Sequence, residues 1–188
     1  GKIARLFNRD SEFGAQYDTL SDLVCFGVAP SLLIYIVYLS SYANLGIMCV
    51  IFFTVCVALR LSRFNTLPDE DKDRFFIGLP SPMAAGLLIS VVLIDYKFDL
   101  FKPEFLNSFF LLFLPLVGLL MVSNIIFPKK TFLNRMKRFN ALIVVSVILI
   151  SILTHVEIGS FILFYLYLLY SLSSYAISKY KASQKSTS

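Results

Sequence analysis

The sequence has 188 residues, of which 57% are hydrophobic, and it carries a formal net charge of +5 with a mean hydropathy of +0.77. An ordinary soluble domain is about 45–50% apolar, so this composition argues against a soluble protein and indicates one that spans a membrane. The three cysteines lie inside apolar runs and share no metal-ligand spacing. They therefore predict neither a disulfide framework nor a thiolate metal site.

Six apolar runs are long enough, or nearly so, to cross a bilayer, which takes about 20 residues of helix. In chain order they are predicted at residues 14–39, 42–61, 80–95, 106–126, 140–154 and 158–178. Pro80 and Pro82 are expected to open the third run, because proline is tolerated in a first helical turn. The pattern predicts an all-α polytopic membrane protein, with one transmembrane domain over residues 1–178 and a polar cytoplasmic tail over residues 179–188.

The basic residues between the apolar runs predict the orientation in the membrane. With the N-terminus in the cytoplasm, fifteen Lys and Arg residues fall on the cytoplasmic side and two, Lys97 and Lys102, on the other. This is a clear positive-inside bias, and it places both chain ends and the start of the first run in the cytoplasm. The net charge is then explained by topology and by contact with anionic lipid, so nucleic acid is not expected as a partner.

Two aspartates, Asp18 and Asp22, lie one helical turn apart at the start of the first run, and Gly14 lies one turn earlier. Residues four apart on a helix share a face, with Cβ atoms about 5–6 Å apart. Either aspartate alone could simply stabilise a helix N-terminus. As a pair, the carboxylates repel each other unless a cation lies between them, and hard oxygen ligands suit Mg²⁺, Ca²⁺ or Mn²⁺. The pair therefore predicts a functional site.

The first 22 residues contain a spaced motif made of Gly1, Ala4, Arg5, Gly14, Asp18 and Asp22. It resembles the signature of the CDP-alcohol phosphotransferase family, Asp-Gly-x2-Ala-Arg-x8-Gly-x3-Asp-x3-Asp, and every motif position that the sequence contains matches. The family's first Asp would stand directly before Gly1, and a further metal-binding Asp would lie three residues earlier. We therefore expect an N-terminal truncation, with one or two transmembrane helices missing.

The resemblance implies a metal-dependent transferase embedded in the lipid bilayer, with CDP-diacylglycerol as its donor. It implies that Asp18 and Asp22 bind Mg²⁺ or Mn²⁺, in a site of two ions, and that Asp22 is also the catalytic base. The residues that it implies for the nucleotide site are Gly1, Ala4, Arg5, Gly14 and Asp18. It further implies a homodimer.

Three more stretches, residues 60–65, 78–86 and 121–128, resemble the bacterial and archaeal phosphatidylserine synthases of this family. This implies transfer of the phosphatidyl group to the hydroxyl of L-serine, giving phosphatidylserine and CMP. Serine is a zwitterion whose carboxylate needs a cation. Arg60, Arg63 and Asn65 are the candidate substrate residues, because they end the second run on the cytoplasmic side, although the two arginines could also be plain positive-inside anchors.

Two alternatives remain open from the sequence. The first keeps the family and changes the acceptor alcohol to glycerol-3-phosphate, inositol phosphate or choline. Five basic residues between 127 and 138 are compatible with a phosphorylated acceptor. The second is a small ion-coupled transporter that uses the aspartate pair as an ion site, although the sequence contains neither an inverted repeat nor a second acidic site.

Overall fold

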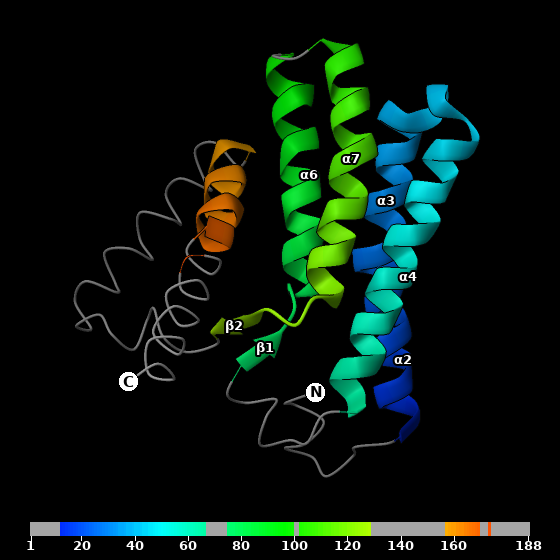
Figure 1. The fold of residues 1–188 in the computed structure, drawn as a ribbon, viewed down its shortest axis with the longest axis vertical. Helices are drawn as coiled ribbons and strands as arrows, with labels where there is room; N and C mark the ends of the chain where they lie inside the picture. The colour runs from blue at the N-terminus through cyan, green and yellow to red at the C-terminus, as the bar shows by residue number, and fades with distance from the viewer. Residues whose placement is uncertain (1–11, 67–74, 100–101, 129–156, 170–172, 174–188) are drawn as a thin grey trace, which may run out of the picture.

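The structure is a computed structural model that describes residues 12–66, 75–99, 102–128, 157–169 and 173 (Figure 1). Almost all of this part is helical. The elements in chain order are α2 (Glu12–Leu23), η1 (Val24–Val28), α3 (Ala29–Ile34), η2 (Tyr35–Leu39), η3 (Ser40–Tyr42), α4 (Asn44–Thr66), β1 (Phe75–Ile77), α6 (Ser81–Phe98), α7 (Pro103–Val122) and β2 (Ile126–Pro128). A shorter apolar helix covers Glu157–Leu169.

Four helical stretches of the described chain are long and apolar enough to cross a membrane, namely Phe13–Tyr42, Asn44–Thr66, Ser81–Phe98 and Pro103–Val122. They correspond to the first four predicted runs, which confirms the all-α polytopic fold. The predicted fifth run, residues 140–154, lies outside the described residues. The sixth run, predicted at 158–178, is described as a helix only over Glu157–Leu169. The polar tail at 179–188 is likewise outside them.

The first membrane helix contains two π-helical turns, η1 and η2, with α3 between them. Pro30 lies in the first turn of α3. Proline lacks the N–H group that a continuous helix needs, and wider turns of this kind are a common way to accommodate a break in the hydrogen-bond ladder. Asp18 and Asp22 precede these turns and lie in the regular part of the helix, α2. The one-turn spacing that the sequence predicts is therefore kept.

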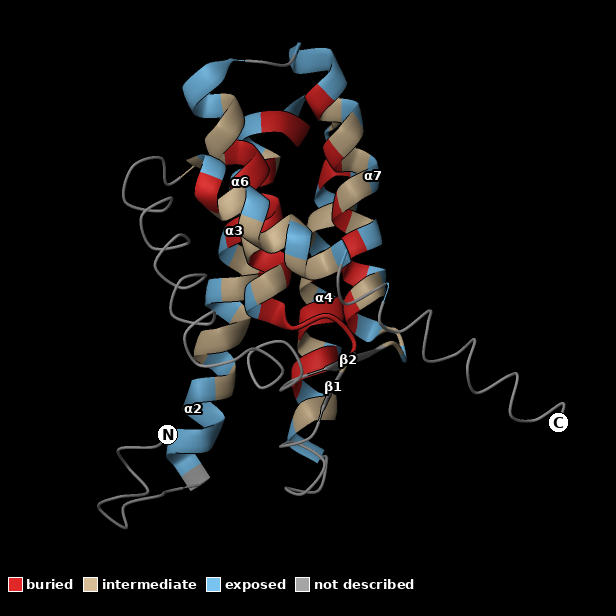
Figure 2. Cartoon of the chain, turned by 90° about the vertical axis from the view of Figure 1, so that its left-hand side faces the viewer, coloured by how far each residue is buried: buried red, intermediate tan, exposed pale blue. Residues whose placement is uncertain are grey.

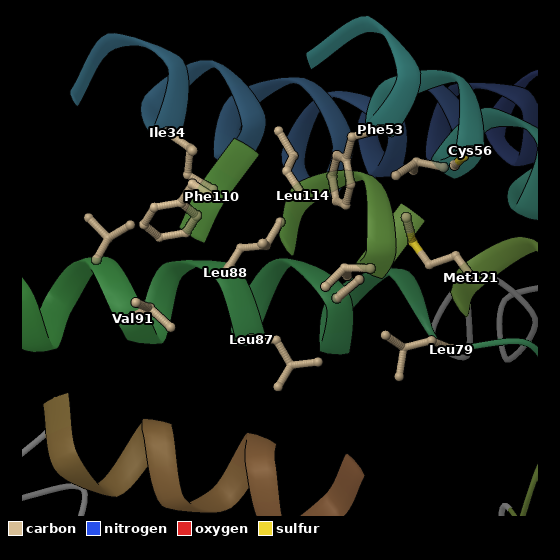
Figure 3. Close-up of a cluster of buried hydrophobic side chains, with 14 of the residues drawn as sticks. Ile34, Phe53, Cys56, Leu79, Leu87, Leu88, Val91, Phe110, Leu114 and Met121 are labelled. Carbon is tan, nitrogen blue, oxygen red and sulfur yellow. The ribbon is translucent and has the colours of Figure 1, made fainter. Parts of the chain in front are cut away.

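The centre of the bundle is an apolar core shared by α3, α4, α6 and α7, with α4 packed along α7 (Figure 3). Its largest fully buried side chains include Ile34, Phe53, Phe110 and Leu114. Membrane helices pack closely where small residues let backbones approach. A Cβ on Gly118 would lie 3.3 Å from Cys56 Sγ, so α7 is already in contact with α4 at this point. Other large apolar side chains stay exposed on the outer faces, where lipid would cover them.

A short antiparallel pair of strands closes one end of the bundle and is a feature that the sequence did not predict. Strand β1 pairs with β2, with Phe76 opposite Phe127. The crossing segment, which we define as residues 78–81, leads from β1 into α6 and binds the end of α7 and the residues that follow it. The amide of Gly78 donates to the Ile125 carbonyl at 2.8 Å, and that of Leu79 to the Leu120 carbonyl at 3.1 Å.

The starts of α2 and α6, the ends of α4 and α7, and both strands lie together at the lower end of the bundle in Figure 1. By the predicted orientation, this is the cytoplasmic end. The opposite end carries the ion pair between Lys97 Nζ and Glu157 Oε2, at 2.8 Å. The helix Glu157–Leu169 thus packs beside α6, where the ring of Phe164 fills the space left by Gly86.

Gly78→Ala is expected to destabilise the protein by about 1–3 kcal/mol. Gly78 has a φ of +76°, and a Cβ there would overlap the carbonyl oxygen of Met121. The measurement is unfolding by SDS in mixed micelles. The control is Leu112→Ala, on the exposed face of α7, which should stay near the wild-type stability. A Gly78→Ala protein as stable as the control would show that the crossing segment does not hold this end of the bundle.

Candidate functional site

The aspartate pair lies on α2, at the end of the bundle where α4 and α7 end and the two strands lie. We call this the polar end. Asp18 is exposed and Asp22, one turn further into the helix, is half-buried. The first turns of α2 extend beyond the packed core and are solvent-accessible (Figure 2). The negative charge of Asp18 acts on Asp22, and so does the positive charge of Arg60. Asp22 is therefore influenced both by a like charge on an exposed residue and by an opposite charge on a buried one.

The end of α4 contacts α2 next to the aspartates. Asn65 Nδ2 donates a hydrogen bond of 3.0 Å to Thr19 Oγ1, and Thr19 in turn donates to the Ala15 carbonyl one turn earlier. Because Thr19 directly follows Asp18, this contact fixes the end of α4 beside the aspartates. The two candidate regions, which are more than forty residues apart in the sequence, are thus in contact.

Arg60 is the charged side chain most deeply placed in this region, with 8% of its surface exposed. Its Nη1 donates a hydrogen bond of 2.7 Å to Ser81 Oγ, at the first residue of α6. Its Nε is buried and has no hydrogen-bond partner among the described residues. A buried charge without full pairing is costly, and the negative charge of Asp22 acts on this guanidinium.

Arg63 is half-buried and turns toward the end of α7. Its Nη2 donates to Asn124 Oδ1 at 2.7 Å, and its Nη1 donates to the Val122 carbonyl at 3.4 Å. With Arg60 bound to Ser81, each arginine of α4 holds a different neighbouring helix. The three stretches singled out in the sequence, residues 60–65, 78–86 and 121–128, therefore meet at one end of the bundle.

The structure brings together five of the candidate residues: Asp18, Asp22, Arg60, Arg63 and Asn65. Gly14 lies one turn before Asp18 on α2, also exposed. Gly1, Ala4 and Arg5 lie outside the described residues. Sequence reasoning did not name Thr19, Ser81 and Asn124 as site residues. The last two belong to stretches that it did single out, but only the tertiary contacts identify them as the partners of the arginines.

The carboxylate pair suits a divalent cation by its chemistry, since both groups offer hard oxygen ligands on one face of a regular helix. Their mutual repulsion is a second reason, because a cation between them would remove it. Within the described residues no group of three or more His, Cys, Asp or Glu side chains is found. The pair therefore supplies part of a ligand set, and hard cations commonly complete theirs with water and substrate phosphates.

The comparisons with known proteins all indicate the same family. The family model described as CDP-alcohol phosphatidyltransferase matches residues 1–127. A Helicobacter pylori protein named CDP-diacylglycerol–serine O-phosphatidyltransferase is 40% identical over 128 residues, covering 68% of this chain and 54% of that protein. A protein of the same name from Methanocaldococcus jannaschii is 40% identical over 129 residues, covering 69% of this chain and 56% of that protein.

A third relative with the same name, from Bacillus subtilis, is 43% identical over 89 residues, which cover 47% of this chain and 49% of that protein. The chain spans about half the length of the curated relatives it matches. The matched region of the family model contains the aspartate pair, both arginines and the crossing segment. The chain belongs to the CDP-alcohol phosphatidyltransferase family.

Proposed function

We propose that this protein transfers the phosphatidyl group of CDP-diacylglycerol to the hydroxyl of L-serine. The products are phosphatidylserine and CMP. Family membership and the names of the relatives support the reaction class. The observation that carries the proposal for this chain is the buried cation Arg60, whose positive charge acts on the half-buried carboxylate Asp22. A zwitterionic amino acid with a hydroxyl needs both a cation for its carboxylate and a base for its hydroxyl.

In this mechanism the serine hydroxyl oxygen attacks the β-phosphorus of CDP-diacylglycerol. A new P–O bond forms to serine, the P–O bond to CMP breaks, and CMP leaves with the electron pair. Asp22 accepts the hydroxyl proton as general base. Its half-buried position suits this role better than the exposed position of Asp18, because a base must meet the acceptor where water is partly excluded.

Asp18 and Asp22 would hold Mg²⁺ or Mn²⁺, in a site of two ions. Bound there, the metal would neutralise the charge on the donor's pyrophosphate and stabilise the leaving CMP. Gly14 has no Cβ, which would let the nucleotide approach the backbone of α2. Gly1, Ala4, Arg5 and Asp18 are proposed for the same nucleotide site.

Arg60, Arg63 and Asn65 are proposed as the acceptor side of the site. The burial of Arg60, its hydrogen bond to the buried Ser81 and the contact of Asn65 with Thr19 of α2 support this role more than simple anchoring does. In our proposal the site faces the cytoplasm. Residues 1–178 form the transmembrane catalytic domain. The protein acts as a homodimer. Family membership removes the basis for the transporter alternative.

The choice of acceptor is tested by measuring CMP release from CDP-diacylglycerol by the whole natural protein in detergent–lipid micelles. We expect release with L-serine in the presence of Mn²⁺ or Mg²⁺, and loss of release after chelation with EDTA. Parallel reactions contain glycerol-3-phosphate, inositol phosphate or choline. CMP release with one of these acceptors and none with serine would contradict the proposal and would leave only the reaction class.

Asp22→Asn is expected to lower the serine-dependent rate by about a hundred- to ten-thousand-fold, the range for loss of a general base. Asp18→Asn is expected to weaken stabilisation of the protein by CDP with Mn²⁺, measured as the shift in melting temperature. Glu104→Gln, an exposed acidic residue in the first turn of α7 at the far end, is the control and should behave as wild type. An active Asp22→Asn enzyme would exclude this residue as the base.

The orientation is tested with single cysteines in a background that lacks Cys25, Cys49 and Cys56. Thr66→Cys marks the polar end of the bundle, and Tyr96→Cys, at a position 90% exposed, marks the opposite end. In intact cells a membrane-impermeant maleimide should label only the cysteine at position 96, while both should be labelled after lysis. Labelling of position 66 in intact cells would reverse the assigned orientation.

A further inference from the structure

The two arginines at the end of α4 keep different numbers of partners. Arg63 donates both terminal nitrogens to the end of α7, to the side chain of Asn124 and to the carbonyl of Val122. Arg60 donates Nη1 to Ser81, while its buried Nε has no hydrogen-bond partner among the described residues. Arg63 therefore joins α4 to α7, and Arg60 retains a donor for a ligand.

An anionic oxygen is the group that would satisfy Arg60. A guanidinium binds carboxylates and phosphates through neighbouring N–H groups held in a fixed plane. A buried donor that stays unpaired carries a desolvation penalty, which a bound anion would remove. Two substrates of the proposed reaction could supply that anion: the carboxylate of the acceptor and the phosphates of the donor.

Ser81 is placed so that it can orient this guanidinium. It is 1% exposed and begins α6, directly after the buried residues Leu79 and Pro80. The crossing segment is itself held by two backbone hydrogen bonds, from Leu79 to Leu120 near the end of α7 and from Gly78 to Ile125 just after it. Ser81 Oγ thus accepts the Arg60 hydrogen bond from a rigid position, and its 2.7 Å length fixes one edge of the guanidinium.

We propose that Ser81 is a positioning residue of the acceptor site, which holds Arg60 in the orientation that binds the carboxylate of serine. This inference rests on the proposed function and adds a residue to it. The distance along the chain explains why the role is not visible from the sequence: Ser81 is 21 residues from Arg60 and reaches it only through the crossing segment. Ser81 itself takes no part in bond making or breaking.

The test compares Ser81→Ala with wild type in the whole natural protein, measuring kcat and KM for serine and for CDP-diacylglycerol separately. A hydrogen bond to a charged group typically changes an equilibrium by about tenfold or more. We expect the KM for serine to rise about tenfold and the KM for CDP-diacylglycerol to change less than about twofold. Ser81→Thr, which keeps the hydroxyl, should restore the KM for serine.

Ser90→Ala is the matched control. Ser90 is equally buried, lies in the same helix, and donates only to the Leu87 carbonyl within α6. It should leave the KM for serine at the wild-type value. This comparison separates loss of positioning from general loosening of α6.

Three results would overturn the inference while the proposed function stands. These are an unchanged KM for serine in Ser81→Ala, an equal rise in Ser90→Ala, and a rise confined to the KM for CDP-diacylglycerol. The last would assign Arg60 to the donor phosphates. A wild-type protein that releases CMP only with another acceptor would instead overturn the proposed function, and the serine-carboxylate site with it.

Discussion

The polar end of this bundle depends on the buried guanidinium of Arg60. A cation taken out of water is tolerated only where nearby groups of opposite charge and hydrogen-bond acceptors replace its hydration. Here Ser81 accepts one hydrogen bond and Asp22 supplies the opposite charge. The start of α6 and the part of α2 that carries Asp22 are therefore held near the end of α4. The aspartate pair and the arginine region, which are separate in the sequence, come together at this end of the bundle.

The rest of the molecule is built to keep that end rigid. The apolar core of α3, α4, α6 and α7 fixes the helix axes, with Phe53, Phe110 and Leu114 fully buried between them. The crossing segment then ties the start of α6 to the end of α7 through backbone hydrogen bonds. Rigid supports of this kind suit phosphoryl transfer, where the protein contributes mainly positioning and charge. The outer faces stay apolar, as a lipid environment requires.

Much of the fold was predictable because a membrane allows few solutions. In a bilayer the backbone must satisfy its own hydrogen bonds, so long apolar runs become helices. The predicted runs at 14–39 and 42–61 accordingly correspond to Phe13–Tyr42 and Asn44–Thr66. The helix ends were less predictable. The run predicted at 106–126 is the helix Pro103–Val122, because the residues after Val122 leave the helix and Ile126 enters a strand paired with Phe75–Ile77. That pairing depends on a partner about fifty residues away, which local apolar patterns do not reveal.

The sequence by itself determined the family motif, the placement of Asp18 and Asp22 on one helical face, and the alternation of the membrane runs. These follow from spacing along the chain and from the periodicity of a helix. Only the tertiary structure decided which cation approaches Asp22 and what holds it there. Arg60 and Arg63 have the same chemistry and lie three residues apart, so nothing local distinguishes them. The difference arises because helix packing buries Arg60 against Ser81 and turns Arg63 toward Asn124, and contacts between distant helices are set by the packing of the whole bundle.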